Sequence, residues 1–249
     1  MSDSAVTGVT ALVTGASRGL GRGIVTALSG AGAQVVGVAR GGAALNDLRA
    51  ELGESFTPVP ADAADPMVAG ALIDQYRPGV LVLNAGATPL PRPIQHHTWQ
   101  TFSRNWDVDV AHAFHWTREA LLAPLAPGST VITLSSGAAV FGSPLSGGYA
   151  GAKAAIRWLT AYAVEESQRA GLGIRFISLL PQLTPETALG AVFAAAYAAR
   201  EGTGAAARSG PGGLLTPEHV GHAVIGLVCG PGPDQDAYLV TAGGLRPLP

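Results

Sequence analysis

The sequence predicts an α/β fold in which an open parallel β-sheet is covered by helices on both faces. Three observations lead to this prediction. Short apolar runs alternate with longer segments of helical periodicity along the whole chain, which is the pattern of repeated βαβ units. Hydrophobic residues make up 47% of the composition and charged residues 13%, which excludes a disordered chain. A length of 249 residues suits a single domain of this class.

The expected strands are short runs rich in Val, Ile, Leu or Phe, which is typical of strands buried on both faces. The seven runs are Val9–Thr14, Gln34–Ala39, Phe56–Pro60, Val80–Leu83, Thr130–Leu134, Ile174–Leu179 and Tyr238–Thr241. The segments between them carry the spacing of amphipathic helices. The expected helices are Gly19–Gly30, Ala43–Leu52, Pro66–Tyr76, Trp99–Leu122, Tyr149–Arg169, Pro185–Arg200 and Pro217–Val228.

One segment interrupts this alternation. Glu201–Gly213 is rich in Gly, Ala and Ser, and we expect it to be a mobile loop within a lid at about 182–215. The sequence contains no repeat and no sign of a second domain. We therefore predict that residues 1–249 form one domain.

The charge, cysteine and histidine content bears on which kinds of partner the protein binds. With 15 Lys and Arg against 17 Asp and Glu, the chain has no basic surplus for nucleic acid. Cys229 is the single cysteine, and no apolar run reaches the roughly 18 residues of a membrane span. The pairs His112 with His115 and His219 with His222 have no third ligand in an obvious relation to them, so no metal is predicted. We expect a soluble cytoplasmic protein that binds neither nucleic acid nor a membrane.

A glycine-rich loop follows the first expected strand. Thr14–Gly21 reads Thr-Gly-Ala-Ser-Arg-Gly-Leu-Gly and leads into a helical pattern. Such glycines let backbone N–H groups and a helix N-terminus approach a pyrophosphate, although the glycines alone would also suit a plain tight turn. The order of strand, loop and helix favours a dinucleotide site.

The end of the second expected strand bears on which dinucleotide binds. A protein that prefers NAD places an acidic side chain there, against the ribose hydroxyls, but this strand ends in Ala39 and Arg40. Arg40 and Arg18 can each donate bidentate hydrogen bonds to a 2′-phosphate, and the alternative is that both are solvated surface charges. We predict NADP(H) as the cofactor.

Ser136, Tyr149 and Lys153 form the candidate catalytic group. Tyr149 follows Ser136 by thirteen residues, and Lys153 lies four residues further along the same helix face. A lysine ammonium and an oxidised nicotinamide are both positive, so we expect them to lower the pKa of the phenol. Tyr149 would then exchange a proton with a substrate oxygen that Ser136 also binds. Taken alone, a Tyr and a Lys at this spacing are also common on ordinary amphipathic helices.

Together these motifs resemble the short-chain dehydrogenases/reductases, and the likeness runs from Val9 to Gly244. Asp62 matches the family's acid after the third strand, and Asn84-Ala85-Gly86 matches its motif after the fourth. The resemblance implies a Rossmann-type doubly wound sheet of strand order 3-2-1-4-5-6-7, hydride transfer from the nicotinamide, and commonly a homotetramer, with a dimer as the alternative. The Tyr-to-Lys spacing is shorter than that of enoyl reductases, so we expect reduction of a carbonyl rather than a C=C bond.

The resemblance also assigns roles to single residues. Ser136, Tyr149 and Lys153 match the catalytic serine, tyrosine and lysine, and Asp109 stands at the fourth catalytic position. Lys153 would in addition hold the nicotinamide ribose, and Thr184 or Thr187 would reach the carboxamide. The residues expected to bind the cofactor are Gly15, Ser17, Arg18, Gly19, Leu20, Gly21, Arg40, Asp62, Ala63, Asn84, Ala85, Gly86, Tyr149, Lys153, Pro181 and Thr184.

Asp109 departs from the family pattern, which has Asn at this position. Asn105 is nearby but four residues out of register. Two interpretations stay open. The carboxylate lies near Lys153 and raises the pKa of Tyr149, or the side chain only bonds backbone within a kinked helix while its carbonyl acts.

The substrate side of the site departs from the family as well. Gln182 replaces the Gly expected after Pro181, and Ile177 replaces an Asn, so no family substrate can be carried over. The candidate substrate-binding residues are Val140, Phe141, Leu145 and Gln182, which are mainly apolar. We predict an apolar small-molecule carbonyl or alcohol substrate, with bulky or hydrophobic ketones preferred over charged ones.

The leading functional hypothesis is an NADPH-dependent carbonyl reductase, or the same chemistry in reverse as an alcohol dehydrogenase. An epimerase or dehydratase is one alternative, although those relatives resemble longer chains with an added substrate domain. A dinucleotide-binding sensor or scaffold without turnover is another, suggested only by Asp109 and Gln182.

Overall fold

The computed structural model describes residues 6–202, 213–230 and 235–249. Within these residues, eight strands form one sheet of order β3-β2-β1-β4-β5-β6-β7-β8. Adjacent strands from β3 to β7 are parallel, and β8 is antiparallel to β7. The strands are β1 (Thr10–Thr14), β2 (Gln34–Ala39), β3 (Phe56–Pro60), β4 (Val80–Leu83), β5 (Thr130–Leu134), β6 (Arg175–Pro181), β7 (Ala237–Thr241) and β8 (Gly244–Pro247).

The predicted strands and their order are confirmed, with shifts of one residue at the starts of β1, β6 and β7 and with two larger differences. β6 extends to Pro181 because its last residues pair with β7, where Pro181 lies opposite Val240. β8 was not expected, because Gly244–Pro247 is too short and too polar to stand out as an apolar run. It covers the outer edge of β7.

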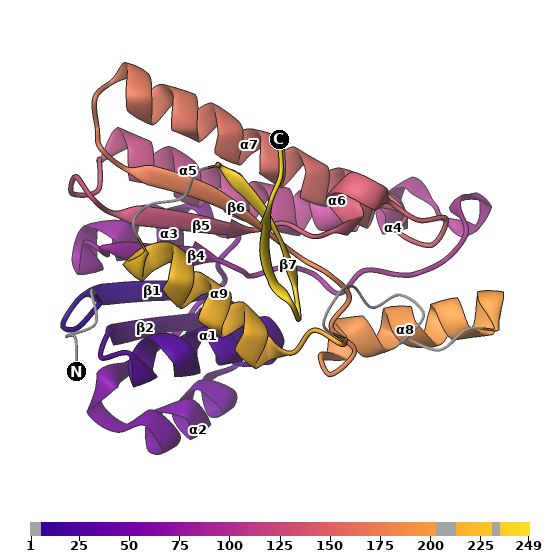
Figure 1. The fold of residues 1–249 in the computed structure, drawn as a ribbon, viewed down its shortest axis with the longest axis horizontal. Coiled ribbons are helices and arrows are strands. Elements are labelled where there is room, and N and C mark those ends of the chain that lie inside the picture. Colours follow the sequence, from indigo (N-terminus) through magenta and orange to yellow (C-terminus); the bar gives the residue numbers. More distant parts are fainter. Residues whose placement is uncertain (1–5, 203–212, 231–234) are drawn as a thin grey trace.

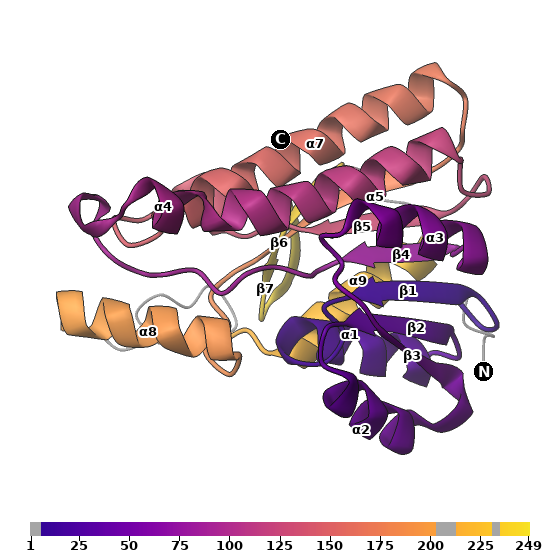
Figure 2. The same ribbon diagram turned by 180° about the vertical axis from the view of Figure 1, so that it is seen from behind.

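Two layers of helices cover the sheet, with α1, α2 and α9 on one face and α3, α5 and α7 on the other (Figures 1 and 2). Side chains alternate between the layers along each strand: Ala11 and Val13 pack toward the first layer and Leu12 toward the second. The helices are α1 (Gly19–Gly30), α2 (Gly42–Leu52), α3 (Pro66–Tyr76), α4 (Trp99–Asn105), α5 (Ala111–Leu122), α6 (Ala138–Phe141), α7 (Gly148–Arg169), α8 (Ala188–Glu201) and α9 (Pro217–Cys229).

The prediction of one continuous helix over Trp99–Leu122 is wrong. A π-helical turn, Trp106–Val110, separates α4 from α5. A π-turn holds one more residue than an α-turn, and it here carries the buried side chain of Asp109. Apolar spacing does not reveal such a turn, because the pattern on either side of it is helical.

Helix α8 projects beyond the carboxyl ends of the strands (Figure 1). It begins at Ala188 rather than at Pro185, because the Thr187 side chain accepts a hydrogen bond from the Gly190 N–H and caps it. α8 is the described helix of the predicted lid, whereas 203–212, most of the predicted mobile loop, lies outside the described residues. Among the described helices, none is long and apolar enough to cross a membrane.

Candidate active site

A cleft of about 930 Å³ opens at the carboxyl ends of the parallel strands. Parallel strands bring the loops that follow them to one edge of the sheet, and ligands of open α/β sheets bind there. All predicted cofactor residues except Gly21 line this cleft, together with the candidate catalytic residues Ser136, Tyr149, Lys153 and Asp109. The predicted cofactor-binding and catalytic residues therefore lie together in one cleft.

The glycine loop is shaped by close backbone contacts. Gly15 has φ +66°, and a Cβ there would lie 2.8 Å from Nδ2 of Asn84 and 2.9 Å from Cα of Ala85. A Cβ on Gly21 would lie 2.0 Å from the carbonyl oxygen of Gly15. Gly21 therefore lies against the back of the loop and does not line the cleft, and a direct role in cofactor binding stays a prediction.

Asn84 ties the glycine loop to β4. Its Nδ2 donates to the carbonyl oxygens of Thr14, at 3.0 Å, and Gly15, at 3.1 Å. Oγ1 of Thr14 accepts the backbone N–H groups of Asn84, at 3.0 Å, and Ala85, at 3.2 Å. The Asn84 amide therefore fixes the shape of the loop, which preorganises the cleft floor.

Arg18 and Arg40 lie exposed on the rim of the cleft. The ion pairs of the described residues involve neither arginine. Asp62 lies at the same end, where its Oδ1 accepts the N–H of Ala64 at 3.0 Å. Two guanidinium groups are thus available beside the end of β2, and a phosphate is the anion that their donor geometry suits.

Ser136, Tyr149 and Lys153 meet in the middle of the cleft. The Ser136 hydroxyl lies close enough to the phenol of Tyr149 to lower its pKa, and it accepts the N–H of Ala138 at 3.2 Å. Nζ of Lys153 lies 5.7 Å from the centroid of the Tyr149 ring and donates to the carbonyl oxygen of Leu134 at 3.0 Å. A serine hydroxyl, a phenol and an ammonium therefore surround one position from which a proton can be exchanged.

Asp109 pairs directly with Lys153. Its carboxylate, in a residue only 1% exposed, lies 3.3 Å from Nζ and accepts the Ala87 N–H at 2.7 Å. Nδ2 of Asn105 donates to both of its oxygens at 3.4 Å. A Cβ on Gly86 would lie 2.9–3.0 Å from this carboxylate, so only Gly leaves room for it. The geometry is that of the first interpretation, in which the carboxylate faces Lys153.

Burial dominates the protonation of Tyr149. It raises the pKa of the phenol, Asp109 and Tyr197 raise it further, and the opposing effects of Lys153 and the Ser136 hydrogen bond are too small to reverse the direction. In the protein alone the pKa of the phenol is therefore raised, and the lowering expected from Lys153 together with an oxidised nicotinamide stays a prediction. Burial would lower the pKa of Lys153, but Asp109 and Tyr149 together raise it, so Lys153 remains an ammonium.

His112 also lines the cleft, and sequence reasoning missed it. It is 1% exposed, its Nε2 has no hydrogen-bond partner, and its ring lies edge-on to Trp116 at 6.2 Å. Burial, then the charges of Lys153 and His115, lower its pKa to about 3. Its position three residues after Asp109, on the same helix face, was the available signal. Among the described residues, no three His, Cys, Asp or Glu side chains are placed to hold a metal ion.

The substrate side is only partly as predicted. Phe141, 67% exposed, and Gln182 line the cleft. Val140 does not, because the short helix α6 turns it to solvent, and Leu145 is buried behind the wall. The wall itself is formed by Phe193 and Tyr197 of α8, which lie within the segment predicted as a lid but were not named as site residues. Their spacing of four residues was the signal.

Known proteins resemble this chain over most of its length. Residues 9–197 match the profile of the family described as short chain dehydrogenase. Carbonyl reductase (NADPH) 2 of Sus scrofa is 31% identical over 156 residues, which cover 61% of this chain and 63% of that protein. L-xylulose reductase of Homo sapiens is 33% identical, over 48% of this chain and 50% of its own length. The chain thus spans about half to two thirds of the length of these relatives.

Two further matches extend the coverage. A 3-beta-hydroxysteroid dehydrogenase of Comamonas testosteroni is 33% identical over 180 residues, which cover 70% of each chain. The crystal structure of 3-ketoacyl-(acyl-carrier-protein) reductase from Brucella melitensis complexed with NADH superposes with a TM-score of 0.79. It covers 96% of this chain and 99% of its own at 24% identity, and it shows the same fold.

Proposed function

The chain belongs to the short-chain dehydrogenase family, and on that premise we propose that it is an NADP(H)-dependent oxidoreductase that reduces a ketone or aldehyde to an alcohol, or catalyses the reverse reaction. The observation that carries the proposal is the meeting of Ser136, Tyr149 and Lys153 in the cleft beside the glycine loop. These three groups provide a hydrogen-bond donor, a proton donor and a fixed positive charge.

In the reductive direction, Tyr149 gives its phenolic proton to the carbonyl oxygen while Ser136 donates a hydrogen bond to the same oxygen. When bound, the nicotinamide supplies the hydride to the carbonyl carbon. Lys153 stabilises the tyrosinate that remains, because its ammonium is held next to the ring by Asp109 and by the carbonyl of Leu134. In reverse, the tyrosinate takes the hydroxyl proton of an alcohol.

The choice of NADP(H) rests on Arg18 and Arg40. Both line the adenosine end of the cleft, and β2 ends without an acid that would bind ribose hydroxyls and repel a phosphate. The name of the Sus scrofa relative specifies NADPH, whereas the Brucella melitensis structure contains NADH, so relatives alone do not decide. The arginines favour the phosphorylated cofactor.

An active enzyme is better supported than a binding scaffold. Asp109 and Gln182 were the grounds for a scaffold, yet Asp109 keeps Lys153 charged beside Tyr149. The cleft does not support the epimerase or dehydratase alternative. Those relatives have an added substrate domain, whereas here the described residues on the substrate side come from a loop and α8 of the same domain. We also propose a cytoplasmic location and a lid function for α8.

The experiment that tests the function is a screen of ketones with NADPH or NADH and of alcohols with NADP⁺ or NAD⁺, followed by the absorbance of the reduced nicotinamide. We expect turnover of apolar ketones with NADPH and its loss in Tyr149→Phe. Dinucleotide binding without turnover of any carbonyl or alcohol would refute the enzyme and favour the scaffold.

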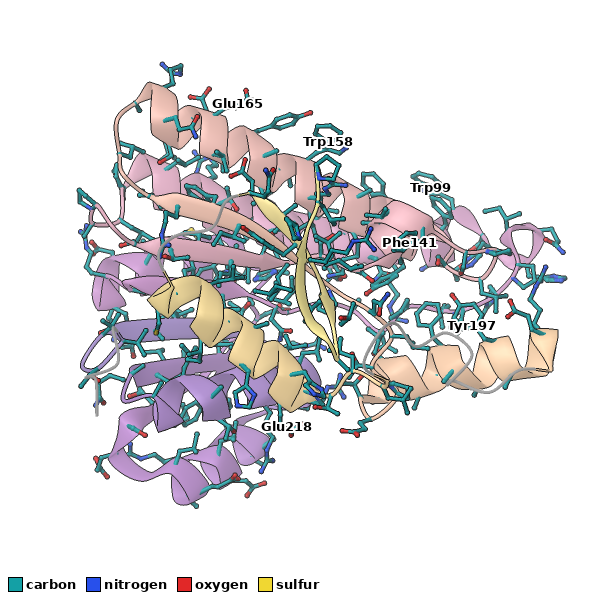
Figure 3. All side chains as sticks on the ribbon, viewed as in Figure 1. Trp99, Phe141, Trp158, Glu165, Tyr197 and Glu218 are labelled. Carbon is teal, nitrogen blue, oxygen red and sulfur yellow. The ribbon has the colours of Figure 1, made fainter. Side chains whose placement is uncertain are left out.

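A homotetramer, or alternatively a dimer, is the proposed assembly. Large apolar side chains stand exposed on α5 and α7, and a hollow lined by Phe114, Leu122, Leu159 and Tyr162 lies between these helices. Figure 3 shows Trp158 of α7 pointing outward on this side. Light scattering coupled to size exclusion tests the assembly, and a monomer at micromolar concentration would contradict it.

A further inference from the structure

Helix α8 presents two stacked aromatic rings to the cleft. Phe193 and Tyr197 lie one helical turn apart, their ring centroids are 5.9 Å apart and their planes differ by 28°. Both residues are buried and line the cleft. The Phe193 ring lies 5.8 Å from that of Tyr149. A continuous aromatic surface, the α8 wall, therefore begins beside the candidate proton donor and extends to Tyr197.

The ring of Tyr197 is also held from across the cleft. Its hydroxyl donates to Oγ of Ser143 at 2.6 Å, and Ser143 Oγ lies 2.8 Å from Oγ of Ser146. Ser143 and Ser146 belong to the loop between α6 and α7, which leads directly into the helix of Tyr149. In Figure 3, Tyr197 projects from α8 on the side that faces Phe141. Stacking and this hydrogen bond together fix the orientation of the outer ring.

Charge is scarce along this wall. Of the charged side chains among the described lining residues, Arg18, Arg40 and Asp62 lie at the adenosine end, and Asp109 and Lys153 neutralise each other. Glu186, at the entrance to α8, is exposed. The nearby hydroxyls bond to one another, so the wall offers ring surface rather than open hydrogen-bonding groups.

Resting on the proposed function, we propose that the α8 wall selects ketones whose carbonyl carbon carries a flat ring, aryl ketones above all, over open-chain and polyhydroxylated ketones. A ring attached to the carbonyl carbon lies within reach of Phe193 when the carbonyl oxygen meets Tyr149. Aromatic pairs then add attraction beyond apolar burial, which a flexible alkyl chain does not gain. Ser143 is a positioning residue, since it acts through the orientation of Tyr197.

The test compares acetophenone with 2-octanone, two apolar ketones with the same number of carbon atoms. We expect the wild-type ratio of kcat/KM with NADPH to favour acetophenone about tenfold or more. Tyr197→Leu and Phe193→Leu should each lower this ratio about fivefold to tenfold, whereas Tyr197→Phe and Ser143→Ala, which keep the rings, should lower it about threefold or less. Val192→Ala, beside Phe193 but on the exposed face of α8, is the matched control and should leave the ratio unchanged.

Binding is measured in parallel, as the dissociation constant of each ketone from ligand-observed NMR. An equal preference in the wild type, or an unchanged ratio in Phe193→Leu and Tyr197→Leu with activity retained, would overturn the role of the wall while leaving the proposed function intact. Binding of acetophenone that weakens in Tyr197→Leu, without turnover of either ketone, would support the wall and refute the function. Neither binding nor turnover of acetophenone would overturn both.

Discussion

Replacing His112 should make the folded protein less sensitive to acid. In the folded state the pKa of this imidazole is lowered from its ordinary 6.5 to about 3, because the ring is buried beside Lys153. The unfolded chain therefore binds a proton at pH values where the folded protein does not. Above pH 6.5 the ring is neutral in both states, so it does not change the free energy of unfolding. As the pH falls from 6.5 toward 3, the free energy of unfolding decreases.

The size of the effect at pH 5 does not depend on the exact folded pKa. A pH of 5 lies 1.5 units below the ordinary histidine pKa of 6.5, so the imidazole is protonated in the unfolded chain. Each of these units changes the free energy of unfolding by about 1.36 kcal/mol. His112 should thus lower the free energy of unfolding by about 2 kcal/mol between pH 7.5 and pH 5. Carboxylates titrate over this range as well, but they do so equally in a variant that lacks only the imidazole.

The measurement is urea unfolding of the wild type, His112→Gln and His112→Leu at both pH values, followed by circular dichroism and by tryptophan fluorescence to establish two-state behaviour. Gln and Leu change the packing differently, but both remove the titrating ring. Each variant should lose about 2 kcal/mol less than the wild type on going to pH 5. Equal losses in all three proteins would refute the reasoning, because His112 would then be protonated in the folded state.

Three further predictions concern the reaction. Tyr149→Phe should lower kcat about 10²- to 10⁴-fold while NADPH binding, measured by nucleotide fluorescence, persists; reduction at the parent rate would contradict the role of the phenol. Arg40→Asp should lower kcat/KM with NADPH about tenfold or more, since a charged hydrogen bond contributes about 1.5–3 kcal/mol, and equal use of NADH and NADPH by the parent protein would argue against the phosphate site. Asp109→Asn removes one of the charges that raise the pKa of Tyr149, so the acid limb of alcohol oxidation should move to lower pH as long as Lys153 keeps its charge; an unmoved limb with turnover retained would mean that only the backbone of Asp109 matters.

The parts of the site that sequence predicted well are local in the chain. The glycine loop follows its strand directly, and Tyr149 and Lys153 share a helix face, so spacing alone places them. Parallel strands then bring Asn84 and Ser136 to the same edge of the sheet. Alternating apolar runs were sufficient for seven of the eight strands in the described residues.

The parts that sequence missed depend on packing between distant elements. The direction of the Tyr149 pKa follows from burial, which spacing does not measure. Leu145 is behind the wall rather than on it because α8 folds over the loop that carries it. Phe193 and Tyr197 were hidden in a segment whose alanines fit many environments. His112 was paired with His115, whereas the larger of the two charges that lower its pKa is that of Lys153, on the distant helix α7.

The π-helical turn Trp106–Val110 makes the length of this part of the chain as important as its composition. α4 is held at the start of α7, where a Cβ on Gly148 would lie 1.8 Å from the carbonyl oxygen of Phe102, and α5 is held against the sheet by the buried Trp116. Deleting one residue of the turn would restore a regular helix but rotate one half against the other by about 100°. Asn105 and Asp109 would no longer meet Ala87 together. Insertions and deletions should therefore be tolerated here far less than substitutions. Because of this, we expect related chains to align without gaps across the turn.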